Sequence, residues 1–330
     1  MLKLTSVGIA AASVAAIFSV SSMASAADWT PKRDIEFVIP YGPGGGFDTI
    51  VRKLSPYIQS ELGGKINVIP KNMPGASGAK AAIDLKRSRP NGTKMMIFNI
   101  PGHAMPNIKG DTKRYDLNAF SWIGRIAKGD YVVVVAGNSG ITDFQGLLDL
   151  KRPVKNPELG AGGTSYMTST IMWSTFGKEV KFITGYKSSS DYALAVIRGD
   201  GDTTMLAAGS FRKYIGGGMK KKANIAPHDL VPVLELTTGK SVFGVKTAKD
   251  YGHPELDNLG LERYIAAPPK LPANIRAALE GAVARALKNP EFDAWANKVG
   301  HGPIQHLDGA ASAKAIANQI NIYKKYADKF

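Results

Sequence analysis

The chain has 330 residues, a formal net charge of +15 and no cysteine. The missing thiols exclude disulfides, thiolate catalysis and zinc–thiolate sites. The length is typical of two lobes rather than one small core, and the positive charge is compatible with a nucleic acid, an anionic membrane face or a small anionic ligand as partner.

The N-terminal segment has the pattern of a secretory signal peptide. It starts Met1-Leu2-Lys3, continues with an apolar stretch and ends in Ala24-Ser25-Ala26. We expect cleavage after Ala26 and a periplasmic mature protein. A membrane anchor is the alternative, but serines interrupt the apolar stretch, which is also short for a bilayer span.

Short β-branched runs alternate with turns and amphipathic helices from Ile35 onward. This alternation predicts an α/β fold with mostly parallel sheets. The expected strands are 35–40, 66–70, 94–99, 131–136, 181–184, 203–206, 231–236 and 263–266. The expected helices are 48–62, 79–86, 143–150, 165–176, 191–198, 272–287, 291–299 and 310–327. We expect residues 1–26 to be the signal peptide, 27–130 with 246–330 to form the first lobe, and 131–245 to form the second.

A glycine-rich segment, Tyr41-Gly42-Pro43-Gly44-Gly45-Gly46-Phe47-Asp48, lies between the first strand and the first helix. Bare backbone N–H groups beside a helix N-terminus favour anion binding, although a purely structural turn is the alternative. The segment lacks the Lys-Ser/Thr ending of a phosphate loop and the spacing of a dinucleotide fingerprint. We expect Asp48 to cap the helix, because its charge would repel an anion.

A second small-residue loop, Gly160-Ala161-Gly162-Gly163-Thr164-Ser165, precedes a helix in the second lobe. We expect the two loops to face each other across a cleft, beside the strand ends at 98–103, 184–189 and 205–210. Lys187 is either a positive ligand contact or an ordinary surface lysine. The basic run Lys220-Lys221-Lys222 lacks a nucleic-acid motif, so we expect a solvated turn and no nucleic-acid partner.

An ordered set of motifs spans essentially the whole mature chain. It comprises the strand and loop at 35–48, Asn72-Met73-Pro74-Gly75-Ala76, Arg89-Pro90-Asn91-Gly92, Gly185-Tyr186-Lys187 and Ala266-Ala267-Pro268-Pro269-Lys270-Leu271-Pro272. Together these motifs resemble the Bug family, the TctC-like receptors of tripartite tricarboxylate transporters. Two departures are Leu206, where many relatives carry an acid, and Ser188, which adds a hydroxyl where glycine is usual.

The resemblance implies a two-lobed type II periplasmic-binding-protein fold. In such a receptor, loop amides, hydroxyls and waters hold a small-molecule carboxylate in the interdomain cleft. The implied ligand-binding residues are Tyr41, Gly44, Gly45, Gly46, Phe47, Asp48, Asn99, Pro101, Gly102, Gly162, Gly163, Thr164, Ser165, Tyr166, Tyr186, Ala207 and Ala208. The implied partners are the membrane permease subunits of a tripartite tricarboxylate transporter, and we expect a monomer.

Three questions stay open at this level. The departures, together with Phe47, Tyr166 and Met167, indicate a less polar pocket, so a fatty or aromatic carboxylate competes with a di- or tricarboxylate. A co-receptor for a sensor kinase would use the same binding physics. A secreted hydrolase is disfavoured because no catalytic motif is present and the histidines are scattered, so we assign no catalytic residue, metal site or cofactor.

Overall fold

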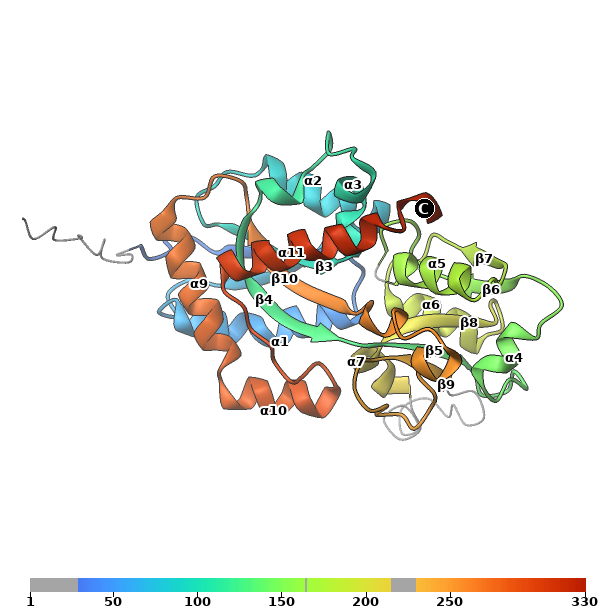
Figure 1. Cartoon of the computed structure of the whole chain (residues 1–330). Helices are drawn as coiled ribbons and strands as arrows, with labels where there is room; N and C mark the ends of the chain where they lie inside the picture. The colour runs from blue at the N-terminus through green and yellow to red at the C-terminus, as the bar shows by residue number, and fades with distance from the viewer. Residues whose placement is uncertain (1–28, 164, 215–229) are drawn as a thin grey trace, which may run out of the picture.

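The computed structural model describes residues 29–163, 165–214 and 230–330. The expected signal peptide, Thr164 and the basic run at Lys220 lie outside these ranges. Figure 1 shows two lobes, each with strands at its centre and helices around them. Within the described ranges, no helix combines the length and the apolar character needed to cross a membrane.

The first lobe contains a five-stranded sheet of order β2-β1-β3-β10-β4. Its strands are β1 (Ile35–Ile39), β2 (Val68–Asn72), β3 (Lys94–Ile100), β4 (Ser121–Gly129) and β10 (Leu261–Ala267). Its helices are α1 (Gly46–Glu61), α2 (Ala79–Arg87), α3 (Met105–Lys109), α9 (Ala273–Leu287), α10 (Pro290–Val299) and α11 (Gly309–Lys324). The predicted apolar stripe of α1 is confirmed, since Ile50, Val51, Leu54 and Ile58 are all buried.

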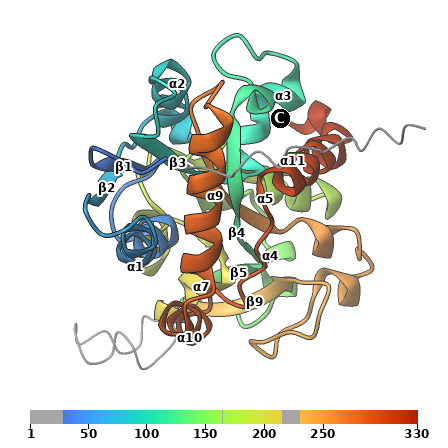
Figure 2. The same ribbon diagram turned by 90° about the vertical axis from the view of Figure 1, so that its left-hand side faces the viewer.

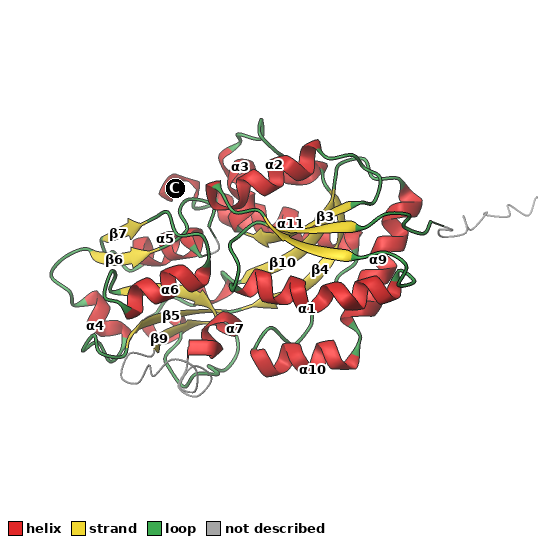
Figure 3. Cartoon of the chain, turned by 180° about the vertical axis from the view of Figure 1, so that it is seen from behind, coloured by secondary structure: helices red, strands yellow, loops and turns green. Residues whose placement is uncertain are grey.

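The second lobe has a three-stranded sheet, β8-β5-β9, and a two-stranded sheet, β6-β7. Its strands are β5 (Tyr131–Ala136), β6 (Val154–Pro157), β7 (Val180–Ile183), β8 (Thr203–Ala207) and β9 (Leu230–Leu236). Its helices are α4 (Phe144–Leu148), α5 (Tyr166–Thr175), α6 (Ser189–Ile197) and α7 (Ala208–Phe211). Figure 3 shows the same two groups of strands from behind.

The two faces of the first sheet carry different helices. Successive residues of a strand point to opposite faces. On β10, Glu262 accepts a hydrogen bond from Gln319 of α11, whereas the next residue, Arg263, lies against the ring of Phe47 in α1. The helices α1 and α11 therefore cover opposite faces, as Figure 2 also shows.

The chain crosses between the sheets through extended segments. β4 ends at Gly129 and β5 starts at Tyr131, so Asp130 alone separates strands of different sheets. The return path runs from β9 to β10, and α11 also bridges the lobes, because Tyr323 Oη lies 3.0 Å from Thr168 Oγ1 of α5. We infer a lobe boundary between residues 130 and 131 and another near 245, where rotation about a few residues would open the cleft.

The prediction of mostly parallel sheets is wrong, although the two-lobed α/β architecture is confirmed. β1 pairs parallel with β2 and β3, and β6 pairs parallel with β7. By contrast, β10 is antiparallel to β3 and β4, and β5 is antiparallel to β8 and β9. Helical crossovers impose parallel pairing, whereas β4, β5, β9 and β10 belong to segments that cross directly between lobes.

Candidate functional site

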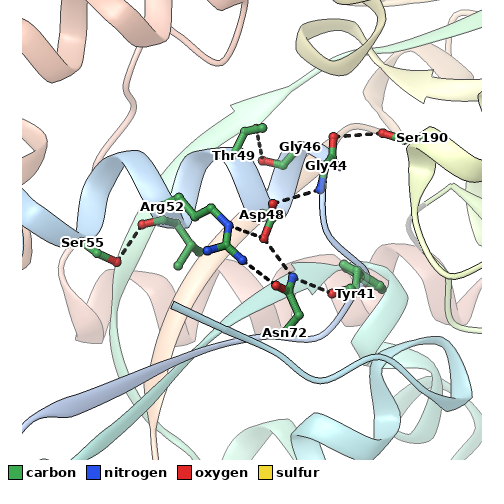
Figure 4. Close-up of polar contacts among 10 residues, drawn as sticks. Tyr41, Gly44, Gly46, Asp48, Thr49, Arg52, Ser55, Asn72 and Ser190 are labelled. Carbon is green, nitrogen blue, oxygen red and sulfur yellow. Dashed lines mark hydrogen bonds and ion pairs between the residues drawn. The ribbon is translucent and has the colours of Figure 1, made fainter. Parts of the chain in front are cut away.

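The glycine-rich loop before α1 is held by a buried carboxylate (Figure 4). Asp48 accepts a hydrogen bond from the backbone N–H of Gly44 at 2.9 Å, and its other oxygen accepts from Arg52 Nε and Asn72 Nδ2, both at 2.9 Å. Asn72 also donates to the carbonyl of Tyr41 at 3.0 Å. One acid thus ties the loop to its own helix and to the end of β2.

The predicted N-cap role of Asp48 is wrong in position. The N-cap residue of α1 is Gly45, and Asp48 lies three residues further, within the first turn. From there its carboxylate reaches back to the N–H of Gly44, the residue before the N-cap. The expectation that Asp48 frames the loop fits this geometry, but the Gly44 amide is consequently occupied by the acid.

Replacing Asp48 with asparagine is expected to lower the free energy of unfolding by about 2–4 kcal/mol. The new amide group would leave Gly44, Arg52 or Asn72 without its acceptor, and a buried unpaired donor costs stability. Urea unfolding measures the effect. Asp34 is a matched control because it is exposed and also accepts from a backbone amide, that of Asn67. An equal loss in Asp34→Asn would contradict the role assigned to Asp48.

The same loop contacts the second lobe directly. The N–H of Gly42 donates to the carbonyl of Lys187 at 2.8 Å, and Ser190 Oγ donates to the carbonyl of Gly44 at 2.9 Å. A Cβ atom added to Gly46 would lie 2.4 Å from Ser210 Oγ. The loop is thus enclosed by the start of α6 on one side and by α7 on the other.

A second pair of loops meets across the lobes. A Cβ atom on Gly102 would lie 2.6 Å from the carbonyl oxygen of Gly162 and 2.9 Å from that of Gly163. The Gly163 N–H donates to the carbonyl of Gly160 at 2.7 Å and so does not point into the cleft. The lobes are closed upon each other here, but the second small-residue loop faces the Gly102 turn rather than the 41–48 loop as expected, because the 41–48 loop faces Lys187, Ser190 and Ser210.

The loop before α5 is also tied to a buried acid. Ser165, the N-cap residue of α5, donates its hydroxyl to Glu158 Oε1 at 2.5 Å. Burial raises the pKa of Glu158 to about 8, although the bonds from Ser165 and the Leu159 amide oppose the shift. Tyr166 packs on Phe182 within its own lobe, with ring centroids 4.6 Å apart. Ser165 and Tyr166 thus support the loop from behind.

Two cavities adjoin the closed interface. A cavity of about 550 Å³ is lined by Tyr41, the 74–78 loop, Leu159 and the 184–187 segment. Of the predicted residues, Tyr41 and Tyr186 lie here, together with the exposed Lys187. The second cavity, of about 470 Å³, is lined by Ala207, Ala208 and Arg263 among others.

Polar groups gather at the end of β3. Asn99 donates through Nδ2 to Tyr41 Oη at 3.0 Å, and Asn99 Oδ1 is buried without a hydrogen-bond partner. His103 is fully buried beside it, and burial lowers its pKa to about 4. The imidazole is therefore neutral at physiological pH, so it supplies a dipole rather than a charge.

Sequence reasoning missed Arg263 and misassigned Ser188. Arg263 was noted only as the first residue of an expected strand, yet it is 2 % exposed and its guanidinium carbon lies 5.3 Å from the centre of the Phe47 ring. The available signal was an arginine directly before an apolar run, Tyr264-Ile265-Ala266-Ala267. Ser188 was expected to add a hydroxyl to the pocket, but it caps α6 by accepting from the Asp191 amide.

Comparison with known proteins found relatives in sequence and in fold. No protein-family model matches the chain. A UPF0065 protein of Bordetella pertussis is 23 % identical over 292 residues, which cover 85 % of this chain and 84 % of that protein. The resemblance to Bug-type receptors is thereby confirmed, as the solved structures described next also indicate.

Two solved structures share the fold over nearly their full length. The periplasmic binding protein BugD matches with a TM-score of 0.78 and 17 % identity, covering 91 % of this chain and 98 % of BugD. MatC from Rhodopseudomonas palustris with bound malate matches with a TM-score of 0.79 and 17 % identity, covering 90 % of this chain and 99 % of MatC. The two-lobed fold of binding proteins is therefore confirmed.

Proposed function

We propose that this protein is a periplasmic receptor that binds a small organic carboxylate between its lobes and delivers it to the permease of a tripartite tricarboxylate transporter. The supporting observation is the convergence of the α1 N-terminus with the loops at Gly102, Gly162 and Ala207 in one closed interface. The first amides of a helix lack intrahelical carbonyl partners, so Gly45, Gly46 and Phe47 at the start of α1 suit an anionic oxygen. The malate bound to MatC supports the same ligand chemistry.

The export route and the transport role belong to this proposal. The N-terminal signal pattern and the likeness to BugD, a periplasmic binding protein, support a periplasmic location. In that compartment a closed binding protein would present its ligand to membrane partners. If deletion of the gene abolishes carboxylate uptake, the transport role is supported. If deletion leaves uptake intact but abolishes the induced response to the carboxylate, the alternative role as a co-receptor for a sensor kinase is favoured.

A panel of carboxylates is expected to identify the ligand by raising the melting temperature. Ligand that binds only the folded state adds about 2.7 kcal/mol of stability at a hundredfold excess over Kd. We would test malate, succinate, citrate, adipate and benzoate by thermal shift and confirm each positive by calorimetry. The corresponding neutral amides are the controls. A panel in which no acid binds better than its amide would contradict the proposed function.

A further inference from the structure

Arg263 is a buried cation that forms no ion pair with any described residue. It is 2 % exposed and, among the residues that the structure describes, belongs to no ion pair. Its Nε is fully buried and has no hydrogen-bond acceptor. Burial lowers the pKa of Arg263 to about 10, which still leaves the guanidinium charged at neutral pH. Burying a charge without a partner is costly, so such a group is retained for a reason other than stability alone.

The position of Arg263 places its charge at the cleft. β10 runs antiparallel to β3, and Arg263 is the register partner of Asn99, so both side chains lie on one face of the sheet. Next to them, Phe47 of the α1 loop contacts both the Arg263 guanidinium, at 5.3 Å, and the Tyr41 ring, at 5.1 Å between centroids. The unpartnered Asn99 Oδ1 and Arg263 Nε thus share the face that carries the α1 N-terminus.

The acids of the adjoining cavity accept hydrogen bonds from other groups, although Glu235 Oε1 has no hydrogen-bond partner among the described residues. Asp130 accepts a hydrogen bond from Thr237 Oγ1 at 2.8 Å, and Glu235 accepts from Ser241 Oγ at 2.7 Å and from the Val242 amide at 2.9 Å. Neither acid forms an ion pair with Arg263 among the described residues. Among the described residues, no acid is therefore in ion-pair contact with this buried guanidinium.

We propose that Arg263 is a specificity-determining residue that pairs with the carboxylate of the bound ligand when the lobes close. The inference rests on the proposed function and adds to it a fixed positive charge in the site. The Arg263 guanidinium lies over the Phe47 ring, and its planar set of N–H donors matches the geometry of a carboxylate. The site then discriminates an acid from the corresponding amide, because the amide offers no negative charge.

The test compares Arg263→Gln with wild-type protein in calorimetric titrations of malate, adipate and benzoate and of malamide, adipamide and benzamide. We expect Arg263→Gln to bind the acids about 100-fold more weakly and to lose most of the preference for acid over amide. Arg87→Gln is the matched control, since Arg87 is exposed in the last turn of α2 and lines neither of the two cavities. The control should bind within about threefold of wild type, as expected for an exposed charge.

The melting temperature without ligand separates a binding role from a structural one. Removing an unpaired buried charge should leave the melting temperature unchanged or raise it, whereas loss of a structural arginine would lower it. If Arg263→Gln melts lower, Arg263→Lys decides: a retained preference for acid over amide supports charge pairing, and its loss in a folded variant contradicts it. Wild-type affinity in Arg263→Gln would overturn this inference alone, while a wild-type protein that binds none of the acids would overturn the proposed function as well.

Discussion

Replacing Gly102 with valine is expected to weaken carboxylate binding by about 1000-fold, a loss of about 4 kcal/mol, while the fold stays intact. The first atom of any side chain at Gly102 would lie 2.6 Å and 2.9 Å from the carbonyl oxygens of Gly162 and Gly163. Both oxygens belong to the backbone of the second lobe, so the overlap is relieved most easily by opening the cleft. An open protein forfeits the contacts that the second lobe makes with the ligand.

Calorimetry measures the ligand affinity of Gly102→Val, and small-angle X-ray scattering measures whether its cleft is open. At saturating ligand, Gly102→Val should keep the larger radius of gyration of an open form, whereas wild type contracts. Gly281→Val is a matched control, because Gly281 lies on α9 and its Cβ would lie 3.1 Å from the flexible end of the Arg285 side chain rather than from backbone of the second lobe. Asn99→Ala shows how much of the loss follows from displacing the Asn99 side chain, which also lies near the new Cβ. Tight binding with unchanged scattering in Gly102→Val would show that closure does not use this contact.

Local sequence pattern predicted most elements of the fold, and the exceptions have local causes. β5 was predicted with its observed bounds because Tyr131-Val132-Val133-Val134-Val135 is a continuous apolar run. β4 was not predicted, because Gly124, Arg125 and Lys128 interrupt its apolar pattern. The structure explains the glycine: a Cβ on Gly124 would lie 2.8 Å from the carbonyl oxygen of Leu307. That close approach is a tertiary requirement which propensity does not report.

The candidate site, like the fold, was predicted only in part from the sequence. The glycine-rich loop was recognisable because its function depends on residues that are consecutive in the chain. Arg263 was not, since its isolation from acids and its contact with Phe47 exist only after β10 has been inserted between β3 and β4. The buried acid Glu158 was likewise invisible, because a single glutamate in a polar-looking segment gives no sign that folding will exclude water from it.

Glu158 is expected to make both stability and ligand binding depend on pH. Burial raises its pKa from an ordinary value of 4.5 to about 8, so the folded state holds a proton that the unfolded state has released. Because the folded state binds more protons at Glu158 between these values, the contribution of Glu158 to the free energy of unfolding should fall as pH rises from about 4.5 to about 8, by about 1.4 kcal/mol per pH unit. Below about pH 6.5 the buried His103, whose pKa is lowered to about 4, contributes a slope of opposite sign. Glu158→Gln should remove the Glu158 contribution, and Glu179→Gln, at an exposed acid, should keep it.

Ligand affinity should also depend on the ionisation of Glu158. Glu158 accepts the hydroxyl of Ser165 at the start of α5, so its ionisation puts a negative charge directly behind a loop proposed to hold an anion. Its close surroundings also include Tyr192, whose pKa is raised well above its usual value by burial first and by the charge of Glu158 second. Wild-type affinity for the best acid of the panel should therefore decrease between pH 7 and pH 9, while the affinity of Glu158→Gln changes little. A pH profile shared by both proteins would mean that the carboxyl group of Glu158 does not influence the cleft.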